Sequence, residues 1–134
     1  MGDSGAYVVG LFFGFLLINL SNENVNISPI YVVNLLWYPA FENLFSILRK
    51  IRKNVSISKP DNYHLHHIIY KKIIKKLPHN KFNNSLTGLS INLFNLTTIS
   101  IATIVASHTL YLTIILFFNI FIYILSYFLL LEKN

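Results

Sequence analysis

The stretch LTGLSINLFNLTTISIATIVASHTLYLTIILFFNIFIYILSYFLLL, residues 86–131, decides the fold because its 46 residues include no Asp, Glu, Lys or Arg. As one straight α-helix at about 1.5 Å per residue it would be about 69 Å long, more than twice the ~30 Å hydrocarbon core of a bilayer. We therefore expect two membrane-spanning helices, at 86–106 and 109–131, separated by a turn near Ser107 and His108.

Two further apolar stretches, residues 6–20 and 30–48, precede this run, and each approaches the ~20 residues that a crossing needs. The chain of 134 residues is 54% hydrophobic and only 12% charged, against roughly 25% charged residues in soluble proteins. The first stretch lacks the basic start and the cleavage site of a signal peptide, so we interpret it as a span. The sequence predicts an all-α, polytopic membrane protein with four transmembrane helices in one domain, 1–134.

The basic residues indicate how the chain is oriented. Ten of the eleven Lys and Arg residues lie in the segment 49–85, which therefore accounts for the net charge of +6. Because basic loops stay in the cytoplasm, we place this loop there. Two crossings then return Asp3 to the same face. Since apolar stretches flank the basic segment on both sides, its partner is expected to be a membrane surface and not a nucleic acid.

The loop 49–85 is predicted to contain an amphipathic helix. Asp61 is a suitable N-cap and Pro78 a suitable stop. A helical wheel separates a polar face from an apolar one: His64, His67, Lys71 and Lys75 against Leu65, Ile69, Ile73 and Leu77. This pattern is typical of a helix that lies in the membrane interface.

The first two spans contain residues that a purely lipid-facing helix does not need. Gly10 and Gly14 form a G-x-x-x-G pair, which would let another helix approach closely. Glu42 lies seven residues before Arg49, or about 10 Å inside the cytoplasmic end of the second span. An ionisable group at that depth is expected to face protein or a water-filled cavity.

The motif H-x-H-H, formed by His64, His66 and His67, carries the strongest chemical signal. Imidazoles in this spacing could ligate a transition metal, donate to phosphate, or lie in a wet interface. The chain has no cysteine, and no paired carboxylate lies nearby to complete a zinc shell. Asp3 on the same face would add a carboxylate suited to Mg²⁺. A carboxylate together with histidines and Lys71 is what phosphoryl transfer at a bilayer surface requires.

Three motifs follow one another along the chain: MGDSGAY (1–7), YPAFENLFSILRK (38–50) and KPDNYHLHHIIYKK (59–72). In this order the chain resembles the polyprenyl-phosphate N-acetylhexosamine-1-phosphate transferases, the glycosyltransferase 4 family, which includes the phospho-N-acetylmuramoyl-pentapeptide transferases. The resemblance covers residues 1–77 through these motifs and the last two spans through topology alone.

The resemblance implies an enzyme that moves a sugar 1-phosphate from a UDP-sugar onto polyprenyl phosphate, releasing UMP, with Mg²⁺ at a cytoplasmic cleft of the inner membrane. Asp3 matches the metal-binding aspartate of the family. His64, His66 and His67 match the catalytic histidine motif that engages the nucleotide-sugar diphosphate. Asp61 matches the acidic residue before that motif, although Asn62 stands where the family often has arginine. The basic helix that carries Lys71 would attract the lipid phosphate.

The chain also departs from the family. Members carry a paired-aspartate motif and a further aspartate-bearing loop, whereas this sequence has aspartate only at positions 3 and 61. Met1 falls where the family has an internal methionine. We therefore expect the C-terminal portion of a larger transferase, inactive alone, which needs the missing N-terminal half or a homodimer partner. The alternatives are a non-catalytic membrane remnant or assembly partner, and a small metal-handling membrane protein that uses its histidines.

Overall fold

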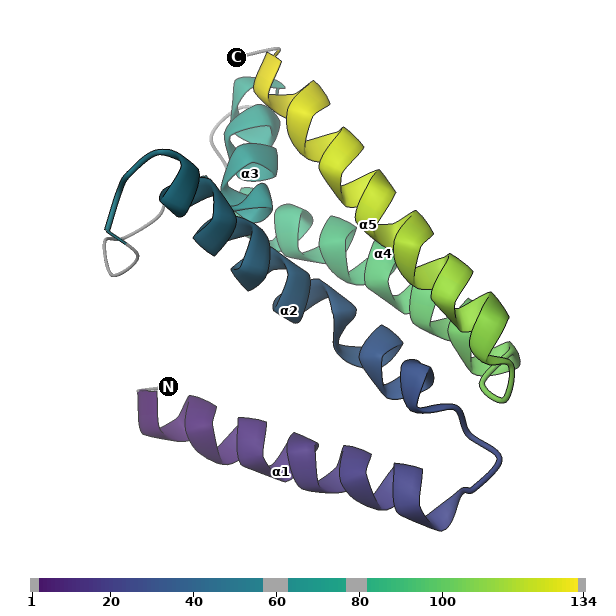
Figure 1. Ribbon diagram of the computed structural model, residues 1–134. Helices are drawn as coiled ribbons and strands as arrows, with labels where there is room; N and C mark the ends of the chain where they lie inside the picture. The colour runs from purple at the N-terminus through teal and green to yellow at the C-terminus, as the bar shows by residue number, and fades with distance from the viewer. Residues whose placement is uncertain (1–2, 57–62, 77–81, 133–134) are drawn as a thin grey trace.

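The computed structural model describes residues 3–56, 63–76 and 82–132 and contains five α-helices in these ranges (Figure 1). They are α1 (Asp3–Glu23), α2 (Pro29–Arg52), α3 (Leu65–Lys76), α4 (Asn83–Ile104) and α5 (Thr109–Glu132). No strand occurs within the described ranges, so the all-α prediction is confirmed.

The long uncharged run folds as predicted into two helices. Helix α4 ends at Ile104 and α5 begins at Thr109, so the turn falls at the predicted Ser107 and His108. The N–H of His108 donates to the carbonyl of Val105 at 2.8 Å, which tightens this turn. Both helices are long and apolar enough to cross a membrane.

Helices α1 and α2 cover the other two predicted spans. The apolar part of α1, Tyr7–Glu23, is shorter than α4 and α5. Helix α2 begins at a local N-cap, where the Ser28 hydroxyl accepts from the N–H of Ile30 at 3.3 Å. Its last turn contains three basic residues, which suit the negative end of a helix dipole. For α1 and α2 the crossings stay a prediction.

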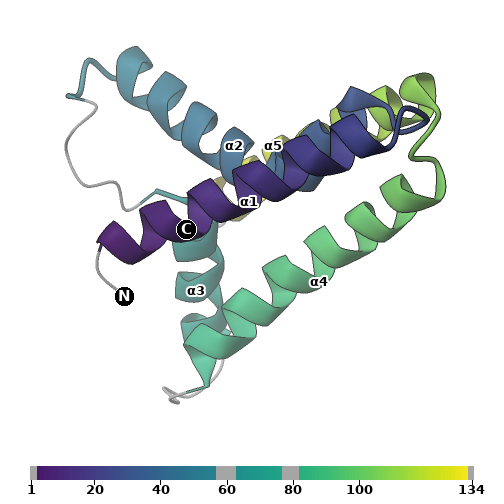
Figure 2. The same ribbon diagram turned by 90° about the horizontal axis from the view of Figure 1, so that it is seen from below.

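Hydrogen bonds fasten the α1–α2 turn to the α4–α5 turn. Ser28 donates its N–H to the carbonyl of Ala106 at 2.9 Å, and its hydroxyl pairs with that of Thr109 at 2.9 Å. The hydroxyls of Tyr31 and Thr103 also pair at 2.9 Å. The two turns therefore share one end of the molecule, and the start of α1, the end of α2 and helix α3 lie at the other (Figures 1 and 2).

Helix α3 packs its apolar side onto the bundle. Leu65 and Ile68 are 7% and 3% exposed and belong to a buried cluster with Trp37 and Tyr123. Lys71 is exposed. The predicted amphipathic character is therefore present. Leu65, however, which the wheel placed on the face toward the membrane interface, contacts protein instead.

The predicted start of the loop helix is wrong. Helix α3 begins at Leu65, and the described residues Tyr63 and His64 before it are not helical. Asp61, which lies outside the described residues, is therefore too early in the chain to be the N-cap. The physical reason is a tertiary one, because a carboxylate from α2 takes the place of a local cap.

The G-x-x-x-G face of α1 is open within the described part of the chain. A Cβ added at Gly10 or Gly14 would meet no atom within 4 Å. The close helix approach predicted for these glycines is therefore not made by α2 to α5, and an approach by another chain stays a prediction.

Candidate active site

The three histidines of the motif lie together at the start of α3. His64 precedes the helix, and His66 and His67 are in its first turn. The ring centroids are 5.5 Å apart for His64 and His66, 6.3 Å for His64 and His67, and 4.2 Å for His66 and His67. The three imidazole rings therefore form one cluster at the start of α3.

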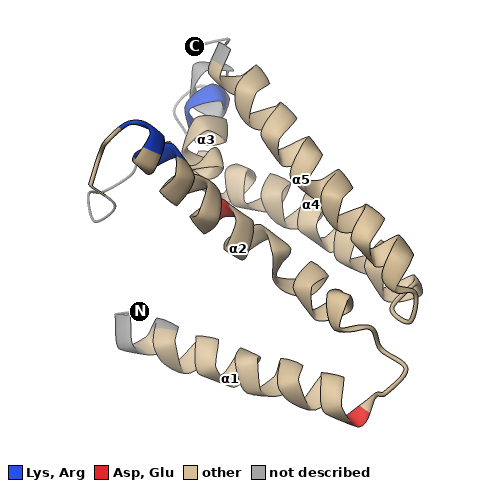
Figure 3. Cartoon of the chain, viewed as in Figure 1, with Lys and Arg blue, Asp and Glu red and all other residues tan. Residues whose placement is uncertain are grey.

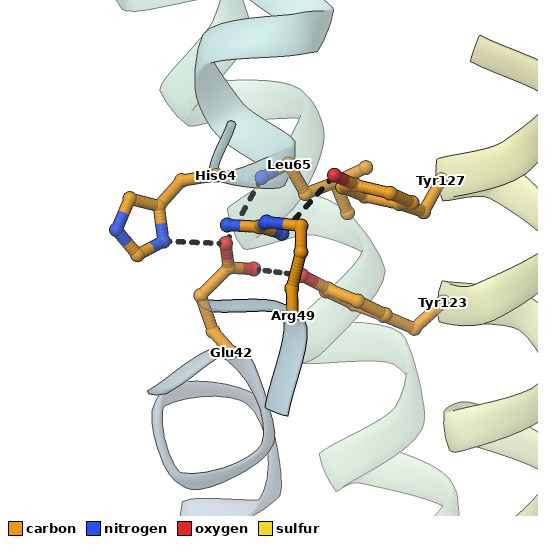
Figure 4. A network of polar contacts seen from close by, with 6 residues as sticks. All are labelled: Glu42, Arg49, His64, Leu65, Tyr123 and Tyr127. Carbon is orange, nitrogen blue, oxygen red and sulfur yellow. Dashed lines mark hydrogen bonds and ion pairs between the residues drawn. The ribbon is translucent and has the colours of Figure 1, made fainter. Parts of the chain in front are cut away.

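Glu42 of α2 fixes the position of this cluster (Figure 4). Its Oε1 accepts from the N–H of Leu65 at 2.9 Å and lies 3.0 Å from Nδ1 of His64. Its Oε2 accepts from the hydroxyl of Tyr123, on α5, at 2.6 Å. One buried carboxylate thus joins α2, α3 and α5 and caps the start of α3, which favours a negative charge. Glu42 was predicted to face protein or a water-filled cavity, and the structure shows that it faces protein.

The contact with Glu42 also selects the tautomer of His64. A carboxylate oxygen can only accept a hydrogen bond, so Nδ1 of His64 must carry the proton. Nε2 of His64 is then left without a proton while the ring is neutral, and it is available to accept a proton. The side chain of His64 is 23% exposed, so a substrate or water can reach it.

A second polar contact between α2 and α5 lies one turn further along α5 than the contact of Glu42 with Tyr123. Nη1 of Arg49 donates to the hydroxyl of Tyr127 at 3.1 Å. The guanidinium also lies over the rings of Phe45 and Tyr127, with centroid distances of 5.7 and 5.5 Å. Tyr123 and Tyr127 are four residues apart on α5 and face Glu42 and Arg49, so this pair aligns α5 with α2 (Figure 4).

The two tyrosines were missed in the sequence because they lie in a run that otherwise suits lipid. A usable signal exists nevertheless. The spacing of Tyr123 and Tyr127, i and i+4, places two hydroxyls on one face of an apolar helix. A buried hydroxyl needs a hydrogen-bond partner, and Glu42 and Arg49, seven residues apart on α2, supply one each.

His66 and His67 open onto a pocket between α3 and α4. The pocket has a volume of about 570 Å³ and is lined by His66, His67, Tyr70, Asn84, Thr87 and Gly88. The N-cap residue of α4, Phe82, makes no side-chain hydrogen bond, so it does not satisfy the first N–H groups of α4. Imidazoles, a phenol and the start of a helix are together chemically suited to an anion such as phosphate.

The environment of His66 favours its neutral form. Partial burial lowers the pKa of His66 below its ordinary value of 6.5, and the neighbouring His67 and His64 lower it further. Glu42 opposes this shift through its negative charge but does not cancel it. At neutral pH, His66 therefore presents one N–H donor and one acceptor nitrogen.

In the folded protein, the imidazole resonances of His66 should titrate below pH 6.5, whereas in denaturant they should titrate near their ordinary value. Between these two pKa values the unfolded chain binds more protons, so the free energy of unfolding should fall as the pH drops through this window. His67→Gln should move the pKa of His66 upward, since it removes a neighbouring imidazole that lowers this pKa. Titration of His66 at or above 6.5 in the folded protein would contradict this prediction.

The remaining predicted site residues are placed as follows. Asp3 begins α1, at the end of the molecule that holds α3, but its side chain lies outside the described residues, as does the whole of Asp61. Lys71 lies one turn after His67 and is exposed. Lys and Arg residues lie at the end of α2 and on α3 (Figure 3). No group of three His, Cys, Asp or Glu that could hold one metal ion occurs in the described part of the chain.

The chain is similar to known transferases over about half its length. It is 28% identical over 72 residues to the undecaprenyl-phosphate alpha-N-acetylglucosaminyl 1-phosphate transferases of Yersinia pestis and Escherichia coli K12. It is 34% identical over 68 residues to a probable undecaprenyl-phosphate N-acetylglucosaminyl 1-phosphate transferase of Bacillus subtilis. These matches confirm the predicted resemblance to the C-terminal portion of such a transferase.

The matched region is 53% of this chain but 20% of the Yersinia pestis protein, and 50% of this chain but 19% of the Bacillus subtilis protein. The chain thus spans about a fifth of the length of the curated relatives it matches. No family model matches the chain, and no solved structure matches it.

Proposed function

We propose that this chain is the histidine-bearing part of an enzyme that transfers an N-acetylhexosamine 1-phosphate from a UDP-sugar to polyprenyl phosphate. The reaction would release UMP and would serve the synthesis of peptidoglycan or another cell-envelope polysaccharide. The observation that carries this proposal is the cluster of His64, His66 and His67, held by Glu42 beside an anion-compatible pocket, in a chain similar to such transferases.

The reaction joins two anionic substrates. An oxygen of polyprenyl phosphate attacks the phosphorus that bears the sugar, and the bond from this phosphorus to the oxygen of UMP breaks. His66 and His67 would donate to the oxygens of the transferring phosphoryl group, where negative charge must be stabilised. His64, oriented by Glu42, would present Nε2 to the substrates as a proton acceptor. Lys71, and Asp61 by its place before the motif, would contact the substrates.

Mg²⁺ is the proposed cofactor, with Asp3 as its protein ligand. Magnesium in phosphoryl-transfer sites is commonly held by one or two carboxylates together with substrate phosphates and water, so one aspartate is compatible with it. Glu42 would not be a Mg²⁺ ligand, because its two oxygens already accept hydrogen bonds from Leu65 and Tyr123 and contact His64. When bound, Mg²⁺ would neutralise phosphate charge.

We further propose that the 134-residue chain is inactive alone, since its relatives are about five times longer than the matched region. The rest of the site would come from a missing N-terminal half or from a second copy. The test is a chimera in which this chain replaces the matched segment of the Escherichia coli transferase. We expect transfer of N-acetylglucosamine 1-phosphate to undecaprenyl phosphate by the chimera and none by the isolated chain.

A chimera that folds and reaches the membrane but shows no transfer would indicate a non-catalytic remnant. Turnover by the purified chain alone would overturn the proposed incompleteness. A chimera with His66→Ala and His67→Ala supplies the necessary control, because it should lose activity without losing membrane insertion.

The proposed location is the inner membrane, with the loop 49–85 in the cytoplasm. The chain has no cysteine, so single cysteines can be introduced without a background. Ser4→Cys and Lys71→Cys are expected to react with an impermeant maleimide only in inverted vesicles, whereas Asn26→Cys should react in spheroplasts. Labelling of positions 4 and 71 from opposite sides would exclude a shared site for Asp3 and the histidines.

A further inference from the structure

A second pocket lies between the ends of α2 and α5, away from the histidines. It has a volume of about 540 Å³ and is lined by Phe45, Leu48, Arg49, Arg52, Lys53, Tyr127, Phe128 and Leu131. It shares no lining residue with the pocket that contains His66 and His67. The reaction proposed above does not use it.

The lining of this pocket divides into two chemical parts. The part along the helices is aromatic and aliphatic, and Leu48 and Phe128 in it are 49% and 53% exposed. The part at the end of α2 carries three cations, Arg49, Arg52 and Lys53. An apolar surface that ends in a cationic rim is complementary to a molecule with an apolar chain and an anionic head.

Basic residues at the end of α2 also have simpler roles, because they suit the helix dipole and the cytoplasmic face. Those roles need no hollow and no aromatic lining. Arg49 moreover donates a hydrogen bond of 3.1 Å to Tyr127 and lies over the ring of Phe45. The cationic rim is therefore in direct contact with the aromatic part of the lining. Lys53 lies over the ring of Tyr63 at 5.0 Å, next to His64 in sequence.

We propose that this pocket binds an anionic glycerophospholipid, with the lipid phosphate on Arg52 and Lys53 and one acyl chain over Leu48, Phe128 and Leu131. The acceptor polyprenyl phosphate is a different molecule, since its phosphate must reach the histidines and this pocket contains none of them. The bound lipid fills the space between α2 and α5. It therefore stabilises the same helix pair that Glu42 and Tyr123 join.

The experiment measures lipid retention by native mass spectrometry of the 134-residue protein, and it does not depend on transferase activity. The probes are phosphatidylglycerol, phosphatidylcholine with identical acyl chains, undecaprenyl phosphate and inorganic phosphate. We expect one phosphatidylglycerol to be retained, and retained at least tenfold more strongly than phosphatidylcholine.

Two pairs of variants locate the site. The double variant Arg52→Gln, Lys53→Gln should weaken phosphatidylglycerol binding by roughly tenfold or more, since each base near an anionic lipid contributes about a factor of five. Lys50→Gln, which removes a charge from the same helix outside the pocket, should change it little. Phe128→Ala should weaken binding several-fold. Phe121→Ala changes a phenylalanine of α5 that is also more than half exposed but lies outside the pocket, and it should not weaken binding.

Each other outcome overturns the proposal. If phosphatidylcholine is retained as strongly as phosphatidylglycerol, charge does not select the lipid. If inorganic phosphate binds as strongly as phosphatidylglycerol, the apolar part of the lining does not contribute. Stronger binding of undecaprenyl phosphate would assign the pocket to the acceptor. Unchanged binding in both the Arg52, Lys53 variant and Phe128→Ala, after circular dichroism has shown that they fold, would place the lipid elsewhere.

Discussion

Glu42→Ala is expected to reduce transfer by the chimeric enzyme by about 10 to 100-fold and to lower the stability of the isolated chain. The substitution leaves the N–H of Leu65 and the hydroxyl of Tyr123 without their acceptor inside the protein. Each unsatisfied buried group costs about 1–3 kcal/mol. His64 loses the contact that fixes its ring, and a displacement near 1 Å at a reacting group is enough for about a 100-fold loss.

The same variant should change the tautomer of His64. In the wild-type protein Nδ1 carries the proton, and without Glu42 the Nε2–H form common in water should appear. Nitrogen chemical shifts of the imidazole measure this directly. This readout separates a positioning role from a merely structural one, because partial unfolding would affect all five histidines alike.

Two controls make this prediction specific. Glu23→Ala removes an exposed carboxylate from the end of α1 and should leave activity, stability and the tautomer unchanged. Glu42→Gln keeps an acceptor oxygen but removes the charge, so an intermediate loss of activity is expected. If Glu42→Ala behaves like Glu23→Ala in all three measurements, the carboxylate does not position the histidine.

The helices were predictable because their signal is local. Charge-free length predicted α4 and α5 and their turn at Ser107 and His108, since a bilayer limits how long a spanning helix can be. The start of α3 was not predictable in this way. Local rules select Asp61 as the cap, whereas the carboxylate that contacts the N–H of Leu65 belongs to Glu42, 23 residues earlier. A tertiary cap has no fixed spacing in the sequence.

The site was predictable in part for a related reason. His64, His66 and His67 are close in the chain, so almost any backbone conformation brings them together. The depth of Glu42 in its span correctly indicated a protein environment but could not name its partners. Tyr123 is 81 residues away, and its role depends on how α5 packs against α2. The side chain of Asp3 lies outside the described residues, so its role stays a proposal.

Asp3→Asn is expected to have the largest effect, a loss of about 1000-fold or more in Mg²⁺-dependent transfer by the chimera. Asparagine keeps the shape of aspartate but lacks the negative charge that a divalent ion needs. Charge stabilisation by a catalytic metal contributes several kcal/mol, and each 1.36 kcal/mol is tenfold in rate. Ser4→Ala, at the next position of α1, is the matched control and should retain activity.

The same substitution separates the transferase from a histidine-based metal carrier. A carrier that binds zinc through His64, His66 and His67 would not need Asp3, so zinc binding by the isolated chain would be the same in Asp3→Asn. Transfer by the chimera within threefold of wild type would show that Asp3 holds no essential metal, although α1 begins at the end of the molecule that carries the histidines. Asp3→Asn is expected to reduce turnover but not membrane insertion, because the carboxylate charge of Asp3 is proposed to act when the two phosphates meet and not when the helices pack.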